Sequence, residues 1–201
     1  MIYSGNFDHA KDAGYGFVIL ENGLGEQLLH KSGEMIIEEA VSSIKVLNES
    51  FIRIEKDGFY GLQSIHGIPY LQNEFIEIDT LAGHLWLEKE NGIALIKPSM
   101  LFPALNGESI KIEFNYDDVD LLANGRIWVS RNGQEAILDT ELQPIIPFGN
   151  YEIYEEVYGW KLVSEKEIKV IHDKYPDLVS ESFEKVEESQ QWLAGKKEDQ
   201  W

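Results

Sequence analysis

A short acidic run holds the side chains best suited to binding chemistry. Asp117, Asp118 and Asp120 lie in the segment NYDDVD, directly after Tyr116. Clustered carboxylates can bind Ca²⁺ or basic side chains, but this run lacks the alternating oxygen ligands and the glycine of a calcium loop. A solvated acidic loop is the simplest interpretation. The functional interpretation is a partner-binding loop, because the run lies in an apparent insertion, where binding residues are often found.

A second candidate group lies further along the chain, where glutamates alternate with aromatic residues. Exposed aromatic residues anchor many protein partners, whereas buried ones here would pack the C-terminal segment onto the rest of the protein. The predicted partner-binding residues of both groups are Tyr116, Asp117, Asp118, Asp120, Tyr154, Glu155, Glu156 and Tyr158.

No residue pattern predicts catalysis, a metal or a cofactor. None of the five histidines forms a pair with zinc-ligand spacing. No Ser/His/Asp order rises above chance, and the short glycine-rich segments lack the Lys-Ser/Thr of a phosphate loop. We therefore predict no catalytic residues, no metal, no cofactor and no enzymatic activity.

The net charge of the chain favours some classes of partner over others. The chain has 17 basic and 36 acidic residues, a net charge of −19. Such a field repels nucleic acid and anionic membranes and accelerates encounters with basic proteins, although acidity also serves solubility. The chain has no cysteine and no long apolar run, and its first residues, MIYSGNFDHAKDAGYG, are polar where a signal peptide is apolar. We expect a cytoplasmic protein.

The elements that must position these residues recur four times along the chain. Each copy contains an alternating run that ends in glycine, and a return run and a second turn follow it. The four runs are Phe17–Gly23, Phe51–Gly58, Leu85–Gly92 and Ile127–Gly133, with closing glycines 35, 34 and 41 residues apart. Alternation favours strands, and Asn-Gly or Asp-Gly favours tight turns. We predict a mainly β fold of four tandem antiparallel hairpin or meander repeats, either stacked or propeller-like.

The C-terminal part differs in pattern. Ser164–Glu167 has the spacing of a helix capping box before an apolar run, and Pro176 would end that short helix. Apolar residues three to four apart predict a second helix that starts near Asp177 and is capped by Gly195. We therefore predict a β-repeat domain at 1–160 and a helical C-terminal cap and tail at 161–201.

The repeats resemble the WG family, named for a Trp-Gly pair. The best match is EKDGFYGLQSIHGIPYL at Glu55–Leu71, in which Tyr60-Gly61 replaces Trp-Gly, and NGQEAILDTELQPIIP at Asn132–Pro147 matches in its turn and its end. The resemblance covers roughly residues 14–160. It implies an all-β repeat array and implies no catalytic residues.

Three classes of function remain open. The leading hypothesis is a non-catalytic, acidic protein-binding module; a concrete version is an immunity or antitoxin protein that neutralises a basic cognate toxin. The alternative is a WG-like scaffold or accessory protein in a larger assembly, with acidity serving only solubility. A carbohydrate-active enzyme is the third class, and it would require a cleft with two carboxylates. The sequence leaves the oligomeric state open.

Overall fold

The chain forms two compact units that consist almost entirely of antiparallel strands. The computed structural model describes residues 7–107, 109–157 and 159–172, together with the backbone of three strands at 175–179, 185–188 and 193–196. The units are Met1–Asn115 (unit 1) and Tyr116–Trp201 (unit 2). The mainly β fold predicted from alternation is confirmed.

Unit 1 contains three sheets, and in each the strands pair in chain order. Sheet A consists of β1 (His9–Gly14), β2 (Phe17–Asn22), β3 (Gly25–His30) and β4 (Met35–Val41). Sheet B consists of β5 (Ser43–Val46), β6 (Phe51–Lys56), β7 (Phe59–Ser64) and β8 (Pro69–Phe75). Sheet C consists of β9 (Glu77–Leu81), β10 (His84–Lys89) and β11 (Gly92–Ile96).

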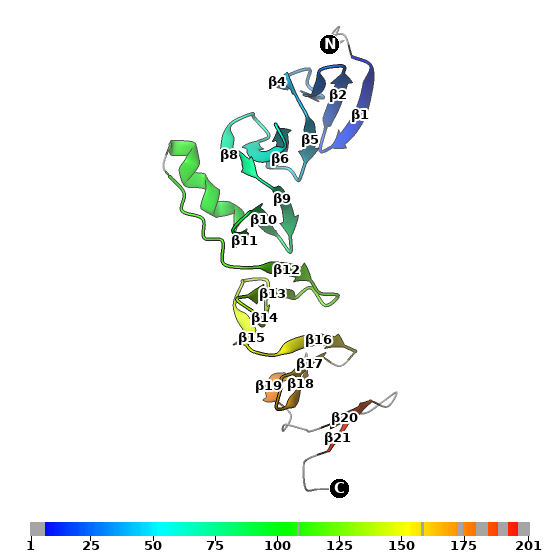
Figure 1. Cartoon of the computed structure of the whole chain (residues 1–201). Helices are drawn as coiled ribbons and strands as arrows, with labels where there is room; N and C mark the ends of the chain where they lie inside the picture. The colour runs from blue at the N-terminus through cyan, green and yellow to red at the C-terminus, as the bar shows by residue number, and fades with distance from the viewer. Residues whose placement is uncertain are drawn as a thin grey trace. The chain divides into compact units, whose positions relative to one another are not determined.

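Sheet C has no fourth strand, because the chain after β11 forms the 3₁₀ helix η1 (Pro98–Asn106). Figure 1 shows η1 as the coiled ribbon that follows β11. The apolar segment Met100–Leu105 lies in this helix. Pro98 stands in its first turn, where a proline costs no hydrogen bond.

Unit 2 contains two further four-stranded sheets and one strand pair. Sheet D consists of β12 (Asp118–Leu121), β13 (Ile127–Arg131), β14 (Gln134–Leu138) and β15 (Pro144–Gly149). Sheet E consists of β16 (Glu152–Glu156), β17 (Gly159–Val163), β18 (Ile168–His172) and β19 (Tyr175–Val179), and the pair is β20 (Lys185–Glu188) with β21 (Leu193–Lys196). Five meander sheets therefore stand in the described chain where four repeats were predicted.

The predicted C-terminal helices are wrong. The capping-box segment instead closes the turn between β17 and β18, where the Ser164 hydroxyl accepts the backbone N–H groups of Lys166 (3.4 Å) and Glu167 (3.1 Å). Serine makes the same local hydrogen bonds at a turn as at a helix N-cap, so the motif alone does not distinguish them. Gly195, predicted as a helix cap, lies in β21, and the domain boundary predicted after residue 160 falls within β17.

The tight turns between the second and third strands follow the prediction in two sheets. Asp57-Gly58 and Asn132-Gly133 have positive φ at both residues (55° and 80°, 52° and 72°), as a type I′ turn requires. In sheets A and C the positive φ instead belongs to the residue after the turn, Gly25 (134°) and Gly92 (133°). Gly92 therefore corresponds to Gly25, and the predicted alignment of Gly23 with Gly92 is wrong by two residues.

Apolar cores lie between consecutive sheets. Within unit 1, Leu28 of sheet A packs with Ile52 of sheet B, and Phe75 of sheet B packs with Leu87 of sheet C. Within unit 2, Ile137 of sheet D packs with Trp160 of sheet E. One residue links sheets A and B and one links B and C, so these neighbours must stack. On β6, Phe51 lies in the core shared with sheet C and its neighbour Ile52 in the core shared with sheet A.

Candidate partner-binding surface

Asp118 and Asp120 of the acidic run lie on an edge strand of sheet D rather than in a loop. β12 occupies one end of the strand order, and Asp118 and Asp120 are exposed on it. The Asp118 carboxylate accepts the backbone N–H of Val119 and the Asp120 carboxylate that of Leu121, each at 2.8 Å. The two acids therefore occupy N–H groups that a sheet edge otherwise leaves open to pairing.

The preceding two residues are held by the sheet itself. Asp117 accepts the backbone N–H of Asn132 at 2.6 Å. The Tyr116 ring stacks on Phe148 with centroids 6.4 Å apart, and the Arg131 guanidinium lies 4.1 Å from the centre of the same Phe148 ring. Burial raises the pKa of the Tyr116 hydroxyl. Tyr116 thus packs on the sheet, so its half-buried ring presents only part of its surface to a partner.

Strand β16 carries the second predicted group. The Tyr154 side chain is exposed, and its hydroxyl donates to the Glu152 carboxylate, a hydrogen bond that raises the pKa of Tyr154. Glu156 pairs with Lys161 at 3.1 Å, whereas Glu155 accepts the N–H of Ala123 at a long 3.5 Å. Tyr158 lies outside the described residues.

A shallow groove of about 400 Å³ brings part of this group together. Its walls are the turn after β12 and the turn after β16, with the lining residues Ala123, Asn124, Glu155, Glu156, Val157 and Gly159. Val157 is fully exposed at its rim. Leu121, at the end of β12, and Tyr154 are each 46% exposed. Exposed apolar side chains and glutamates therefore lie together at and near this groove.

A second groove of about 500 Å³ lies at the other end of the same two sheets. It is lined by Gly133, Glu135, Asn150, Tyr151, Glu152, Val163, Ser164 and Glu165. Glu135 is already engaged there, because one of its carboxylate oxygens accepts the Trp128 indole N–H (2.9 Å) and the Ile153 N–H (2.8 Å). This groove was not predicted.

Glu26 and Glu135 link neighbouring sheets, and neither was predicted from the sequence. Each is the second residue of the third strand of its sheet, and each accepts the N–H of the second residue of the next sheet's first strand. For Glu26 that residue is Ile44, at 2.6 Å, and the other carboxylate oxygen binds Lys11 at 2.8 Å. An alignment of GEQ at Gly25 with QEA at Gln134, guided by the turns, would have found them.

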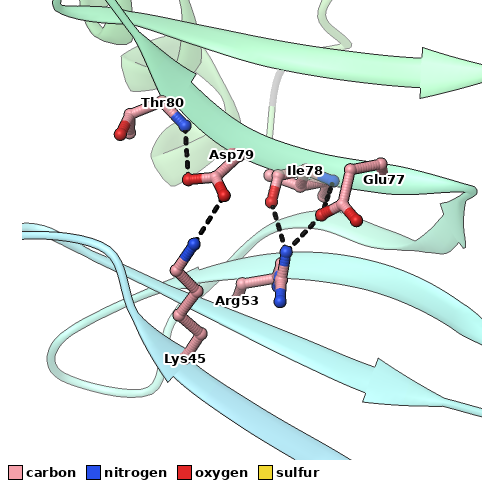
Figure 2. Close-up of polar contacts among 6 residues, drawn as sticks. All are labelled: Lys45, Arg53, Glu77, Ile78, Asp79 and Thr80. Carbon is pink, nitrogen blue, oxygen red and sulfur yellow. Dashed lines mark hydrogen bonds and ion pairs between the residues drawn. The ribbon is translucent and has the colours of Figure 1, made fainter.

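The most connected charged cluster lies in unit 1, between sheets B and C (Figure 2). Lys45 of β5 pairs with Asp79 of β9, and Arg53 of β6 pairs with Glu77 and donates to the Ile78 carbonyl at 3.0 Å. Burial raises the pKa of Asp79, but the Lys45 hydrogen bond, the Thr80 N–H and the charges of Lys45 and Arg53 outweigh it, so the pKa is lowered.

The described residues include histidines and many carboxylates, the side chains that most often bind metal ions. No group of three or more His, Asp or Glu side chains among them could hold a metal ion. The Lys111 hydrogen bond and charge lower the pKa of the Glu113 carboxyl, as Lys45 lowers that of Asp79. No helix in the described segments combines the length and apolar character needed to cross a bilayer.

Comparisons with known proteins do not place the chain in a family. No model of a protein family matches it, and no curated protein matches it. The WG resemblance therefore stays a prediction.

Several solved structures match the chain at low similarity. Hsv2 of Kluyveromyces lactis has 12% identity and a TM-score of 0.35, with 84% of this chain and 60% of that chain covered. The dihydro-heme d1 dehydrogenase NirN has 10% identity and a TM-score of 0.37, with 88% and 46% covered. The extracellular domain of BT4673 from B. thetaiotaomicron has 14% identity and a TM-score of 0.36, with 88% of this chain and 31% of that chain covered. The chain thus spans less than two thirds of these structures, and at these TM-scores they do not bear on its function.

Proposed function

We propose that this chain is a non-catalytic, acidic protein-binding module whose partner is a basic protein. The supporting observation is the groove of unit 2, where fully exposed Val157 stands beside Glu155 and Glu156. Apolar anchors bordered by charge are typical of protein interfaces, and complementary charge increases the association rate. The net charge of −19 favours a cationic partner. A basic, nucleic-acid-directed toxin is one partner of this kind, and the chain would then act as its immunity protein.

The test compares variants of the groove in quantitative pull-downs from native lysate. We expect Val157→Ser with Glu155→Gln to lose a basic partner that the parent chain retains at low salt and releases at high salt. The matched control is Glu49→Gln, which removes one charge from an exposed turn residue in unit 1. A partner held equally by all three proteins, or held independently of salt, would contradict the proposal.

A scaffold in which apolar contacts govern binding is the second candidate. It is favoured by the exposed side chains of Met100 and Phe102 on η1, which are 44% and 55% exposed. In that case partner retention is insensitive to salt, and Met100→Ser with Phe102→Ser abolishes it while the groove variant does not.

A further inference from the structure

We propose that Asn22 is a site of spontaneous covalent modification, where the fold itself promotes deamidation to aspartate and isoaspartate. The chain contains several Asn-Gly pairs, in which the glycine nitrogen can attack the preceding side-chain amide because glycine has no Cβ to hinder the approach. The pairs are Asn22-Gly23, Asn91-Gly92, Asn106-Gly107, Asn124-Gly125 and Asn132-Gly133. In the folded chain the reaction is selective for the first of them.

The reaction is a ring closure followed by hydrolysis. The Gly23 nitrogen gives its proton to hydroxide and forms a bond to the Cγ atom of Asn22. The bond from Cγ to the side-chain nitrogen breaks, and that nitrogen takes a proton from water and leaves as ammonia. Solvent water then opens the succinimide ring at either carbonyl, which gives aspartate or isoaspartate without any transfer of electrons. The rate depends on a free glycine N–H, an open approach, and stabilisation of the negative charge that develops on Oδ1.

The hairpin between β2 and β3 meets all three requirements at Asn22. Gly23 is exposed in the turn, and within the part of the chain that the structure describes its N–H donates to no acceptor. A Cβ built at Gly23 meets nothing within 4 Å, so the approach is open. The backbone N–H of Leu24 donates to the Oδ1 atom of Asn22 at 2.9 Å. This hydrogen bond folds the side chain back along the turn and stabilises the oxygen on which the charge develops.

Two of the other pairs have an attacking nitrogen that is already engaged. Asn124 is the closest match to Asn22, because its Oδ1 atom also accepts the backbone N–H two residues later, at 3.0 Å. The Gly125 N–H, however, donates to the Leu122 carbonyl at 2.9 Å. The Gly107 N–H donates to the Ala104 carbonyl at 3.0 Å. Each of these hydrogen bonds must break before the nitrogen can attack.

The remaining two pairs lack the donor to the side-chain oxygen. Among the described residues, none donates a hydrogen bond to the Oδ1 atom of Asn91 or of Asn132. Gly92 is also a strand residue, paired with Lys89 in the ladder of sheet C. Asn22 is therefore the pair member that combines a free attacking nitrogen with a donor to its side-chain oxygen.

The isoaspartate product would alter the link between sheets A and B. Isoaspartate carries the main chain through the side chain and so lengthens the backbone of the hairpin shortly before Glu26. The Glu26 carboxylate accepts the Ile44 N–H at 2.6 Å. We expect this N–H to exchange with solvent faster in the isoaspartate form, separated by anion-exchange chromatography, than in the parent chain. Equal exchange rates, measured by NMR, would contradict this consequence.

The selectivity is tested by incubating the folded full chain at mildly alkaline pH and mapping its peptides by mass spectrometry. We expect deamidation at Asn22 to be about tenfold faster than at Asn124, since the hydrogen bond of the Gly125 N–H must break first. In urea the rates should become alike, because the turns no longer form. Earlier deamidation of another pair in the folded chain, or the same selectivity in urea, would overturn the inference.

Gly23→Ala tests the route of the reaction. The added methyl group meets no neighbour in the fold but stands beside the attacking nitrogen, so deamidation of Asn22 should slow about tenfold or more. Deamidation of Asn132 in the same sample is the internal control and should be unchanged. Direct hydrolysis by water gives aspartate and no isoaspartate. An unchanged rate at Asn22 in this variant, or a product without isoaspartate in the parent chain, would overturn the inference.

Discussion

Carboxylates have three different structural roles in this chain, and the position of each carboxylate in its sheet determines its role. Glu26 and Glu135 join one sheet to the next, Asp79 neutralises a cation between sheets, and Asp120 covers an open edge. With 36 acids in the sequence, their residue type alone cannot separate these roles. Each role follows from which strand carries the acid and what faces it.

Removal of the Glu135 carboxylate should destabilise unit 2. Glu135→Ala leaves the Ile153 N–H and the Trp128 indole without their acceptor, which costs about 1–3 kcal/mol. Glu135→Gln keeps one acceptor oxygen and should cost less. Urea denaturation followed by tryptophan fluorescence measures both. Gln134→Ala is the neighbouring control, and an effect as large as that of Glu135→Ala would contradict the assignment.

The ion pair between Asp79 and Lys45 should make the free energy of unfolding depend on pH. Its pKa is lower in the folded protein, so the ionised form stabilises the fold above the ordinary pKa of about 3.9. That contribution is lost as the pH falls through the lowered pKa. Asp79→Asn should therefore flatten the acid limb of unfolding free energy against pH below about pH 5. An unchanged limb, measured by urea denaturation at each pH, would contradict this.

At the scale of the element, the strand that follows the tight turn in each sheet, called here the return strand, has one position where neighbouring groups come very close to the backbone. The third residue of the return strand is small in sheets B, C and D: Gly61, Ala94 and Ala136. A Cβ added at Gly61 would stand 2.9 Å from the side-chain amide oxygen of Asn73 and 3.0 Å from the backbone carbonyl oxygen of Leu71. Asn73 donates to the carbonyls of Ile54 and Phe59, so it cannot easily move.

We expect Gly61→Ala to lower the stability of unit 1 by about 1–3 kcal/mol, as overpacking does. Gly23→Ala is the control, because its added methyl group meets nothing within 4 Å and its φ is not positive. It should be neutral or slightly stabilising, since alanine restricts the unfolded chain. Thermal unfolding measures the stability of both variants. Equal losses of stability would show that the change in backbone freedom, and not the contact with Asn73 and Leu71, causes the effect.

At the scale of the whole molecule, net charge opposes folding. A charge of −19 on 201 residues produces self-repulsion, and exposed ion pairs such as Lys111–Glu113 offset little of it. NaCl at about 0.5 M screens charges beyond a few ångströms. We therefore expect the melting temperature to rise between low salt and about 0.5 M NaCl. A fall in melting temperature would show that the ion pairs outweigh the repulsion; KCl serves as the control for a specific ion effect.

The sequence by itself determined the antiparallel sheets, because alternation and Asn-Gly or Asp-Gly turns are local signals. It also located the acidic residues. It did not reveal sheet E, whose turns contain no Asn-Gly or Asp-Gly pair. The pattern of Ser164–Glu167 predicts a helix start, because serine makes the same hydrogen bonds at a turn as at a helix N-cap.

Only the tertiary structure decided what each of these side chains contacts. Tyr116 packs on Phe148 and Asp117 accepts the Asn132 N–H, whereas Asp118 and Asp120 accept N–H groups of their own edge strand. These outcomes depend on strand order and on residues that are distant in the chain. Local pattern carries no information about them, because a carboxylate's partner is set by which strands become neighbours when the sheets stack.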